Sequence, residues 1–260
     1  MLRQAAAVAG CRTIGDDMYR LRRAAADAAR GSGDTAGAAA DLATAATIAF
    51  RFSATFVRVP AREEVLALIA EAREPAGDDP AAQAAVALAE AAVLTDAFGA
   101  VQGPPGNAVP ETIARAERAV ELARRTGDPL AESAALDALT CAHTWAGDTF
   151  ATAAMSRRRI TLLSSLPMSP AGSQELIDAL GMVTEAGLGA GDVPGARGWA
   201  RQLADHPSLA EVGHRAPLMV DALAGDVEEV LAGSVRLLDA WRGQAAPPGR
   251  TSGRRWPPWR

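Results

Sequence analysis

The residues whose chemistry and spacing could form a metal site are few. Cys141 and His143 offer two ligand types, but residues two apart on a helix point about 200° away from each other. His206 and His214 have no ligand neighbours at helical spacing. Because a structural or catalytic metal needs three or four converging ligands, no metal site is predicted.

Phosphate binding and acid–base catalysis are equally poorly supported. Gly187, Gly189 and Gly191 are spaced like a phosphate loop, but they follow a predicted helix, and Asp192 stands where G-x-G-x-x-G needs its third glycine. A flexible turn between helices is the favoured interpretation. Paired carboxylates lie near predicted helix starts, where capping and the helix dipole account for them: Asp16/Asp17, Glu63/Glu64, Asp78/Asp79 and Glu228/Glu229. No acid–base couple and no G-x-S-x-G elbow is predicted.

Lysine is absent, and all 26 basic residues are arginine. This excludes a P-loop lysine, a Schiff-base lysine, a kinase-type lysine and a Ser-x-x-Lys pair. We therefore expect no enzymatic activity and no cofactor.

A binding role has a few candidate residues. Arg157, Arg158 and Arg159 form the most concentrated charge in the body of the chain. On a helix they spread over most of the circumference, so at least one should face the neighbouring repeat or its groove, where it could contact an anion or a peptide. A solvated arginine face is the alternative. Trp145 and Trp199 are candidates to line a pocket.

Composition limits the partners and the compartment. The net charge is −5, and Arg250, Arg254, Arg255 and Arg260 lie near the end, so the preceding body is more acidic still. Such a body is a poor match for nucleic acid. Two cysteines imply no disulfide framework and suit the cytoplasm. No apolar run is long enough for a membrane span. The run 8–11 (Val-Ala-Gly-Cys) fits a lipoprotein cleavage box, but the preceding apolar stretch is too short, so a frayed first helix is favoured.

Repeated Gly-Asp pairs divide the chain into helices. Glycine suits the left-handed position after a helix, and the following aspartate can cap the next one. The aspartates of these pairs are Asp34, Asp78, Asp128, Asp148, Asp192 and Asp226. They predict helices over 35–50, 80–98, 111–126, 129–146, 149–163, 193–204 and 227–241, with further helices over 16–30, 60–73, 173–190 and 215–224. Ser173 is the expected cap of its helix. The run 99–110, rich in proline and glycine, is the expected insertion.

These elements predict an all-α fold of about twelve helices: a right-handed superhelical solenoid of antiparallel helix pairs with degenerate tetratricopeptide-like repeats. Gly191 and Gly225 are one 34-residue repeat apart, whereas Thr152 and Arg159 do not suit the small positions of such a repeat. We expect a lead-in over 1–15, the repeat domain over 16–242 and a disordered Pro/Arg/Trp-rich tail over 243–260. The tail is either a segment for acidic or aromatic-lined partners, or the unselected end of a truncated or frameshifted reading frame.

Two runs carry a family resemblance: residues 124–139, RRTGDPLAESAALDAL, and residues 189–197, GAGDVPGAR. They resemble the tetratricopeptide-like arms of large multidomain bacterial transcriptional regulators of the LuxR-type and related groups. The resemblance covers roughly 16–242. It implies a surface that senses a partner or inducer. The chain has no P-loop, and its last residues are not a DNA-binding domain, so the resemblance implies the arm alone.

The expected function is a non-enzymatic module for protein interaction or effector sensing, which works by groove recognition. The alternative is a stand-alone small-molecule-binding helical protein, with Trp145 or Trp199 at the pocket. A solenoid without a polar capping repeat exposes the apolar face of its last helix, so we also expect self-association through Leu231, Leu238 and Trp241.

Overall fold

The computed structural model describes residues 1–11, 14–93, 108–167, 169–207 and 215–243. These residues form twelve α-helices, one short 3₁₀ helix and no strand, so the prediction of an all-α fold is confirmed. The elements are α1 (Leu2–Cys11), α2 (Gly15–Gly31), α3 (Thr35–Arg51), η1 (Ser53–Thr55), α4 (Arg62–Arg73), α5 (Pro80–Val93), α6 (Val109–Thr126), α7 (Pro129–Trp145), α8 (Thr149–Ser164), α9 (Pro170–Gly189), α10 (Val193–Ala204), α11 (Arg215–Ala224) and α12 (Val227–Gly243).

The Gly-Asp pairs are the turns between helices, as predicted. All six glycines have a positive φ, between 51° and 82°, where an L side chain would be strained: Gly33, Gly77, Gly127, Gly147, Gly191 and Gly225. Asp34, Asp128, Asp148 and Asp192 each accept a hydrogen bond from a backbone N–H in the first turn of the next helix. In these four turns the glycine ends one helix and the aspartate caps the next, so the sequence specifies the reversals locally. Before α5 the cap is Asp79, which accepts from the N–H of Ala82 at 2.8 Å, and not Asp78 of the Gly-Asp pair.

The start of α9 differs from the sequence prediction. Ser173 is not its cap; it is buried inside the helix. Ser169 caps instead, with its Oγ accepting a hydrogen bond from the N–H of Gly172 at 3.1 Å. The helix begins earlier because Pro170 suits its first position, where no N–H is needed.

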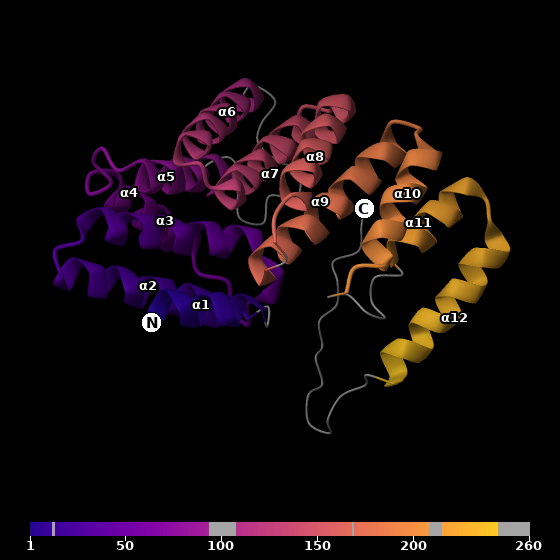
Figure 1. Cartoon of the computed structure of the whole chain (residues 1–260), viewed down its shortest axis with the longest axis horizontal. Helices are drawn as coiled ribbons and strands as arrows, with labels where there is room; N and C mark the ends of the chain where they lie inside the picture. The colour runs from indigo at the N-terminus through magenta and orange to yellow at the C-terminus, as the bar shows by residue number, and fades with distance from the viewer. Residues whose placement is uncertain (12–13, 94–107, 168, 208–214, 244–260) are drawn as a thin grey trace.

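Helices pack chiefly against those that precede and follow them in the chain, from α1 and α2 at one end of the molecule to α12 at the other (Figure 1). One contact departs from this order. The helices α3 and α5 pack directly on each other, and α4, which lies between them in the chain, contacts both. Alanine permits this close packing: Ala39, Ala43 and Ala46 of α3 are completely buried. The contact pattern is that of stacked helices; the right-handed superhelical path stays a prediction.

The first helix is part of this packing. The sequence predicts a frayed lead-in over 1–15, whereas α1 contacts α2 and also α9, far along the chain. Its Ala6 and Ala9 are buried. This helix therefore brings the start of the chain against the middle of the array.

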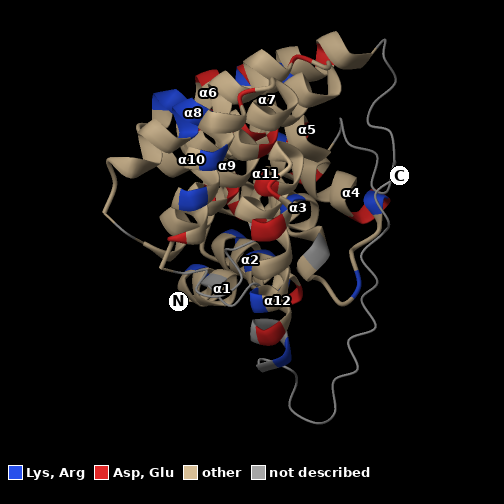
Figure 2. Cartoon of the chain, turned by 90° about the vertical axis from the view of Figure 1, so that its right-hand side faces the viewer, with Lys and Arg blue, Asp and Glu red and all other residues tan. Residues whose placement is uncertain are grey.

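Several predictions fall on residues outside those described: most of the tail over 243–260, most of the insertion over 99–110, and His214. Within the described ranges, no helix is both long and apolar enough to cross a bilayer. Acidic and basic residues are interspersed along the helices in the view of Figure 2, rather than separated onto two sides.

Candidate functional site

A cavity of about 520 Å³ lies among six helices. The first two helices, α3, α5, α7 and α9 all contribute to its wall. Most of the lining is apolar, including Val8, Met18, Ile48, Leu88 and Leu130. A space of this size with apolar walls and a few polar groups is typical of a small-molecule site. We call it the first cavity.

Arg51, Gln174 and Glu175 contribute polar groups to the first cavity, and Arg22, which pairs with Asp41, lines it as well. Arg51 is the last residue of α3, and the other two lie on α9. The side chain of Gln174 has no hydrogen bond to any described residue, so its amide can still donate and accept. Arg51 and Glu175 are already engaged with each other, through a contact of 2.5 Å between Arg51 Nη1 and Glu175 Oε1.

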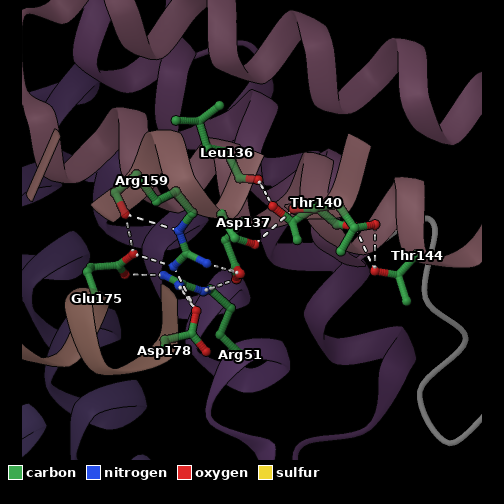
Figure 3. Close-up of polar contacts among 11 residues, drawn as sticks. Arg51, Leu136, Asp137, Thr140, Thr144, Arg159, Glu175 and Asp178 are labelled. Carbon is green, nitrogen blue, oxygen red and sulfur yellow. Dashed lines mark hydrogen bonds and ion pairs between the residues drawn. The ribbon is translucent and has the colours of Figure 1, made fainter. Parts of the chain in front are cut away.

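Next to these residues lies an ionic cluster of two arginines and three carboxylates, of which Asp178 is the one exposed member (Figure 3). Arg159 is completely buried; its Nη1 donates to Asp137 at 2.6 Å, and its Nη2 donates to Glu175 at 3.0 Å and to Asp178 at 2.7 Å. Arg51 contacts the same three carboxylates, with its Nε 3.0 Å from Asp137 Oδ2. The cluster joins α3 to α7, α8 and α9, and each arginine bridges all three acids.

Helical spacing brings these polar groups to one place. On α7, Ser133, Asp137 and Thr140 follow one another at intervals of four and three residues, which places them on one face. All three are buried. On α8, Thr152, Ser156 and Arg159 repeat this spacing and are buried as well. A polar stripe on each helix faces its neighbour, where apolar residues would normally lie.

The electrostatics follow from two cations among three anions. The guanidinium groups of Arg51 and Arg159 hold the pKa of Asp137 and of Glu175 below their ordinary values, against the opposing effect of burial. For Asp178 the balance is reversed: burial and the charge of Asp137 raise its pKa to about 6. The cluster therefore carries one carboxylate more than its arginines can neutralise.

A second cavity, of about 460 Å³, lies against the cluster. Its apolar lining includes Phe50, Phe52, Ile177 and Met182. Asp137, Cys141 and Asp178 also line it, and it shares Arg51, Phe52, Gln174 and Glu175 with the first cavity. The two cavities thus meet at the ionic cluster.

The predicted binding arginines are divided by the structure. Arg157 and Arg158 lie on the exposed side of α8, where Arg158 Nη2 is 2.8 Å from Glu132 Oε1 and Arg157 is 3.9 Å from Asp192. Arg159 faces inward and belongs to the ionic cluster. Trp145 and Trp199 are half-buried, and neither lines the first or second cavity.

Sequence reasoning missed Arg51, Asp137, Glu175 and Asp178. One sequence pattern could have indicated the site: a charged residue at helical spacing from residues of a buried face. The clearest example is Asp137, which lies on the same face of its helix as Ser133 and Thr140. The partners of Asp137 lie up to 86 residues away, on other helices. Their convergence therefore had no local sequence signal.

The remaining candidates for chemistry stay apart. Cys141 lines the second cavity, and burial with the nearby charges of Asp137 and Asp178 raises the pKa of its thiol to about 12, which suppresses the reactive thiolate. Among the described residues, no group of three His, Cys, Asp or Glu side chains is arranged to hold a metal ion.

Comparison with known proteins gives no family for this chain. No family model matches it, and no curated protein does.

Proposed function

We propose that this chain is a non-enzymatic effector-sensing module that binds a small molecule in the first cavity. The carrying observation is the cavity itself, about 520 Å³ with mostly apolar walls from six helices and a few polar groups. The contact of α1 with α9 supports enclosure, because it joins the beginning of the chain to the far wall.

The size of the cavity suits a small molecule. Its volume of about 520 Å³ lies within the roughly 300–1,000 Å³ that is typical of small-molecule sites.

The resemblance to LuxR-type regulator arms supplies a biological context for this proposal. In that context the chain would report an inducer to other parts of a bacterial transcriptional regulator and would itself contact no nucleic acid. We place it in the cytoplasm, because two cysteines in 260 residues provide no disulfide framework.

The test is calorimetric titration with 6-phenylhexan-1-ol, an apolar probe with one hydroxyl group. We expect saturable binding that is lost in Ala134→Trp, because Ala134 lines the cavity and an indole would fill it. Ala81→Trp is the matched control, since Ala81 lies on the exposed first turn of α5 and lines neither cavity. Absence of binding to the unmodified protein, or equal binding by the two tryptophan variants at equal urea midpoints, would refute the proposal.

A further inference from the structure

The charge of the ionic cluster indicates what kind of molecule the cavities accept. With every group ionised, Arg51 and Arg159 supply two positive charges, and Asp137, Glu175 and Asp178 supply three negative ones. Both oxygens of Asp137 and both of Glu175 contact an arginine. The arginine contacts of Asp178 all run through Oδ2. Oδ1 of Asp178 is therefore the carboxylate oxygen of the cluster that no arginine among the described residues contacts, and Asp178 also hydrogen-bonds with Asp137.

Asp178 is accessible to a ligand. It lines the second cavity, and its side chain is 45% exposed, in contrast to the 13% and 11% of Asp137 and Glu175. Phe50 lines the same cavity, and aromatic faces attract cations, whereas the ring of Phe52 already lies under the guanidinium of Arg51, with Cζ 6.0 Å from the ring centroid. The two cavities adjoin here, because the same residues line both of them: Arg51, Phe52, Gln174 and Glu175.

We propose that the effector is a monocationic amphiphile whose apolar body occupies the first cavity and whose ammonium group pairs with Asp178. This inference rests on the proposed function, since it names the ligand class of the same cavity. An anionic ligand is disfavoured because both arginines of the ionic cluster are already committed to its three carboxylates, and Arg22, which also lines the first cavity, is paired with Asp41. A cation brings the cluster to neutrality.

A proton and this cation compete for the same carboxylate. The pKa of Asp178 is raised to about 6 by burial and by Asp137. Below that pH a proton neutralises the Asp178 carboxylate, and above it the cationic ligand does so. The charged and titratable groups around Asp178 are Arg51 on α3, Asp137 and Cys141 on α7, Arg159 on α8 and Glu175 on α9. Binding of the cation near pH 6 should therefore release a proton.

Three probes with one apolar body test the charge preference: 6-phenylhexylamine, 6-phenylhexan-1-ol and 6-phenylhexanoate. We expect the amine to bind at least tenfold more tightly than the alcohol at pH 7.5, and the carboxylate to bind most weakly. Asp178→Asn gives the cluster two charges of each sign, so the amine should fall to the affinity of the alcohol while the alcohol is unaffected. Titration of the unmodified protein at pH 6 in two buffers of different ionisation enthalpy measures the proton release without any variant.

The outcomes distinguish the preference for a cation from the more general proposal that the first cavity binds a small molecule. If the alcohol binds but the amine has no advantage, or keeps its advantage in Asp178→Asn, the charge inference is overturned and the cavity remains a ligand site. If the amine binds near pH 6 without releasing a proton, its pairing with Asp178 is overturned. If neither probe binds the unmodified protein, both proposals fail.

A separate observation concerns the surface of the last helix. Four large apolar side chains of α12 are exposed on one face, at helical spacing: Val227 by 64%, Leu231 by 63%, Val235 by 59% and Leu238 by 42%. Within the described residues α12 packs against α11, through its opposite side. Figure 1 shows α12 at the end of the array.

We infer that this face pairs with the same face of a second copy, with the two α12 helices antiparallel. The first turn of α12 is acidic, with Glu228 and Glu229, and its last turn carries Arg242, which also pairs with Asp239 of the same turn. An antiparallel pair places the acidic start of each helix near Arg242 of the other, whereas a parallel pair would place the two acidic starts together. Because the surface is self-complementary only in this direction, a two-fold dimer is the geometry that it favours.

Sedimentation velocity tests the dimer over a range of protein concentrations. We expect a concentration-dependent dimer that Leu231→Glu abolishes. Ala232→Glu introduces the same charge at the next, exposed position, off the apolar face, and should leave the dimer intact. Glu228→Arg should weaken the dimer, and adding Arg242→Glu should restore it. A monomer at every concentration, or equal effects of the two glutamate variants, would overturn the inference.

Discussion

Removal of Arg159 tests whether the ionic cluster stabilises the fold. In Arg159→Met the apolar stem is retained, and the guanidinium that contacts Asp137, Glu175 and Asp178 is lost. Arg51 would then face three carboxylates alone, and the net charge of the cluster would change from −1 to −2. Breaking a buried ion pair by removing one partner costs about 3–5 kcal/mol, because it leaves an uncompensated buried charge. That is a large share of the roughly 5–15 kcal/mol of a typical domain.

The adjacent arginine provides a matched control. Arg158→Met removes a guanidinium from the same helix, but this one is 48% exposed and pairs with Glu132 at the surface. Exposed pairs contribute about 0.2–1 kcal/mol. The expected difference between the two variants is therefore several-fold, although their sequence changes are identical in kind.

Urea unfolding followed by both circular dichroism and tryptophan fluorescence measures the free energies of unfolding. Adding Asp178→Asn to Arg159→Met should recover part of the loss, because the net charge of the cluster returns from −2 to −1. If Arg159→Met and Arg158→Met each cost less than about 1 kcal/mol, the exposed-pair magnitude would apply to both, and the stabilising role of the buried cluster would be refuted.

Three further predictions follow from the same region and from the turns. The pKa of Asp178 is raised from 3.8 to about 6, so its contribution to stability is fully present below pH 4 and is lost as the pH rises through 6. The urea midpoint should accordingly fall between pH 4 and 7, and Asp178→Asn should flatten this dependence. The thiol pKa of Cys141 is raised to about 12, so Cys141 should react with iodoacetamide at pH 8 far more slowly in the native than in the urea-unfolded protein. The rates are measured in Cys11→Ser, which leaves Cys141 as the one thiol, and equal rates in the two states would contradict the burial of Cys141. Asp148→Ala removes the cap on the N–H of Ala151 and should cost about 1 kcal/mol in urea unfolding, and no loss would show that the cap is dispensable.

The fold could be predicted because its signals are local. Gly147 and Asp148 specify a helix end and the next helix start within two residues, and their backbone is as the sequence predicts. The start of α9 could not be placed, because Ser169 and Ser173 are both acceptable caps and the choice depends on Pro170. Local chemistry thus defines most helix boundaries, and ambiguity remains where two caps compete.

The candidate site lacked such local signals. Arg159 and Thr152 were recognised as unsuited to the small positions of a tetratricopeptide-like repeat, and both are buried on α8, where Arg159 belongs to the ionic cluster. The departure from the repeat pattern was therefore visible in the sequence. The sequence does not show what this departure means, because an arginine in a helix interface requires carboxylates from other helices. Such partners lie far apart in the chain: 124 residues separate Arg51 from Glu175.

Arg51 links ligand binding to the packing of the array. Its guanidinium lines both cavities and holds carboxylates of α7 and α9, so it belongs at once to the proposed binding site and to the ionic cluster. A cation at Asp178 would compensate the charge that this cluster leaves unpaired, and would stabilise the contacts of α3 with α7 and α9 as it binds. Binding at the cavity would in this way tighten the junction between the first helices and the later ones. The proposed sensing function requires such a coupling, in which the ligand changes the free energy of a helix interface as well as filling a space.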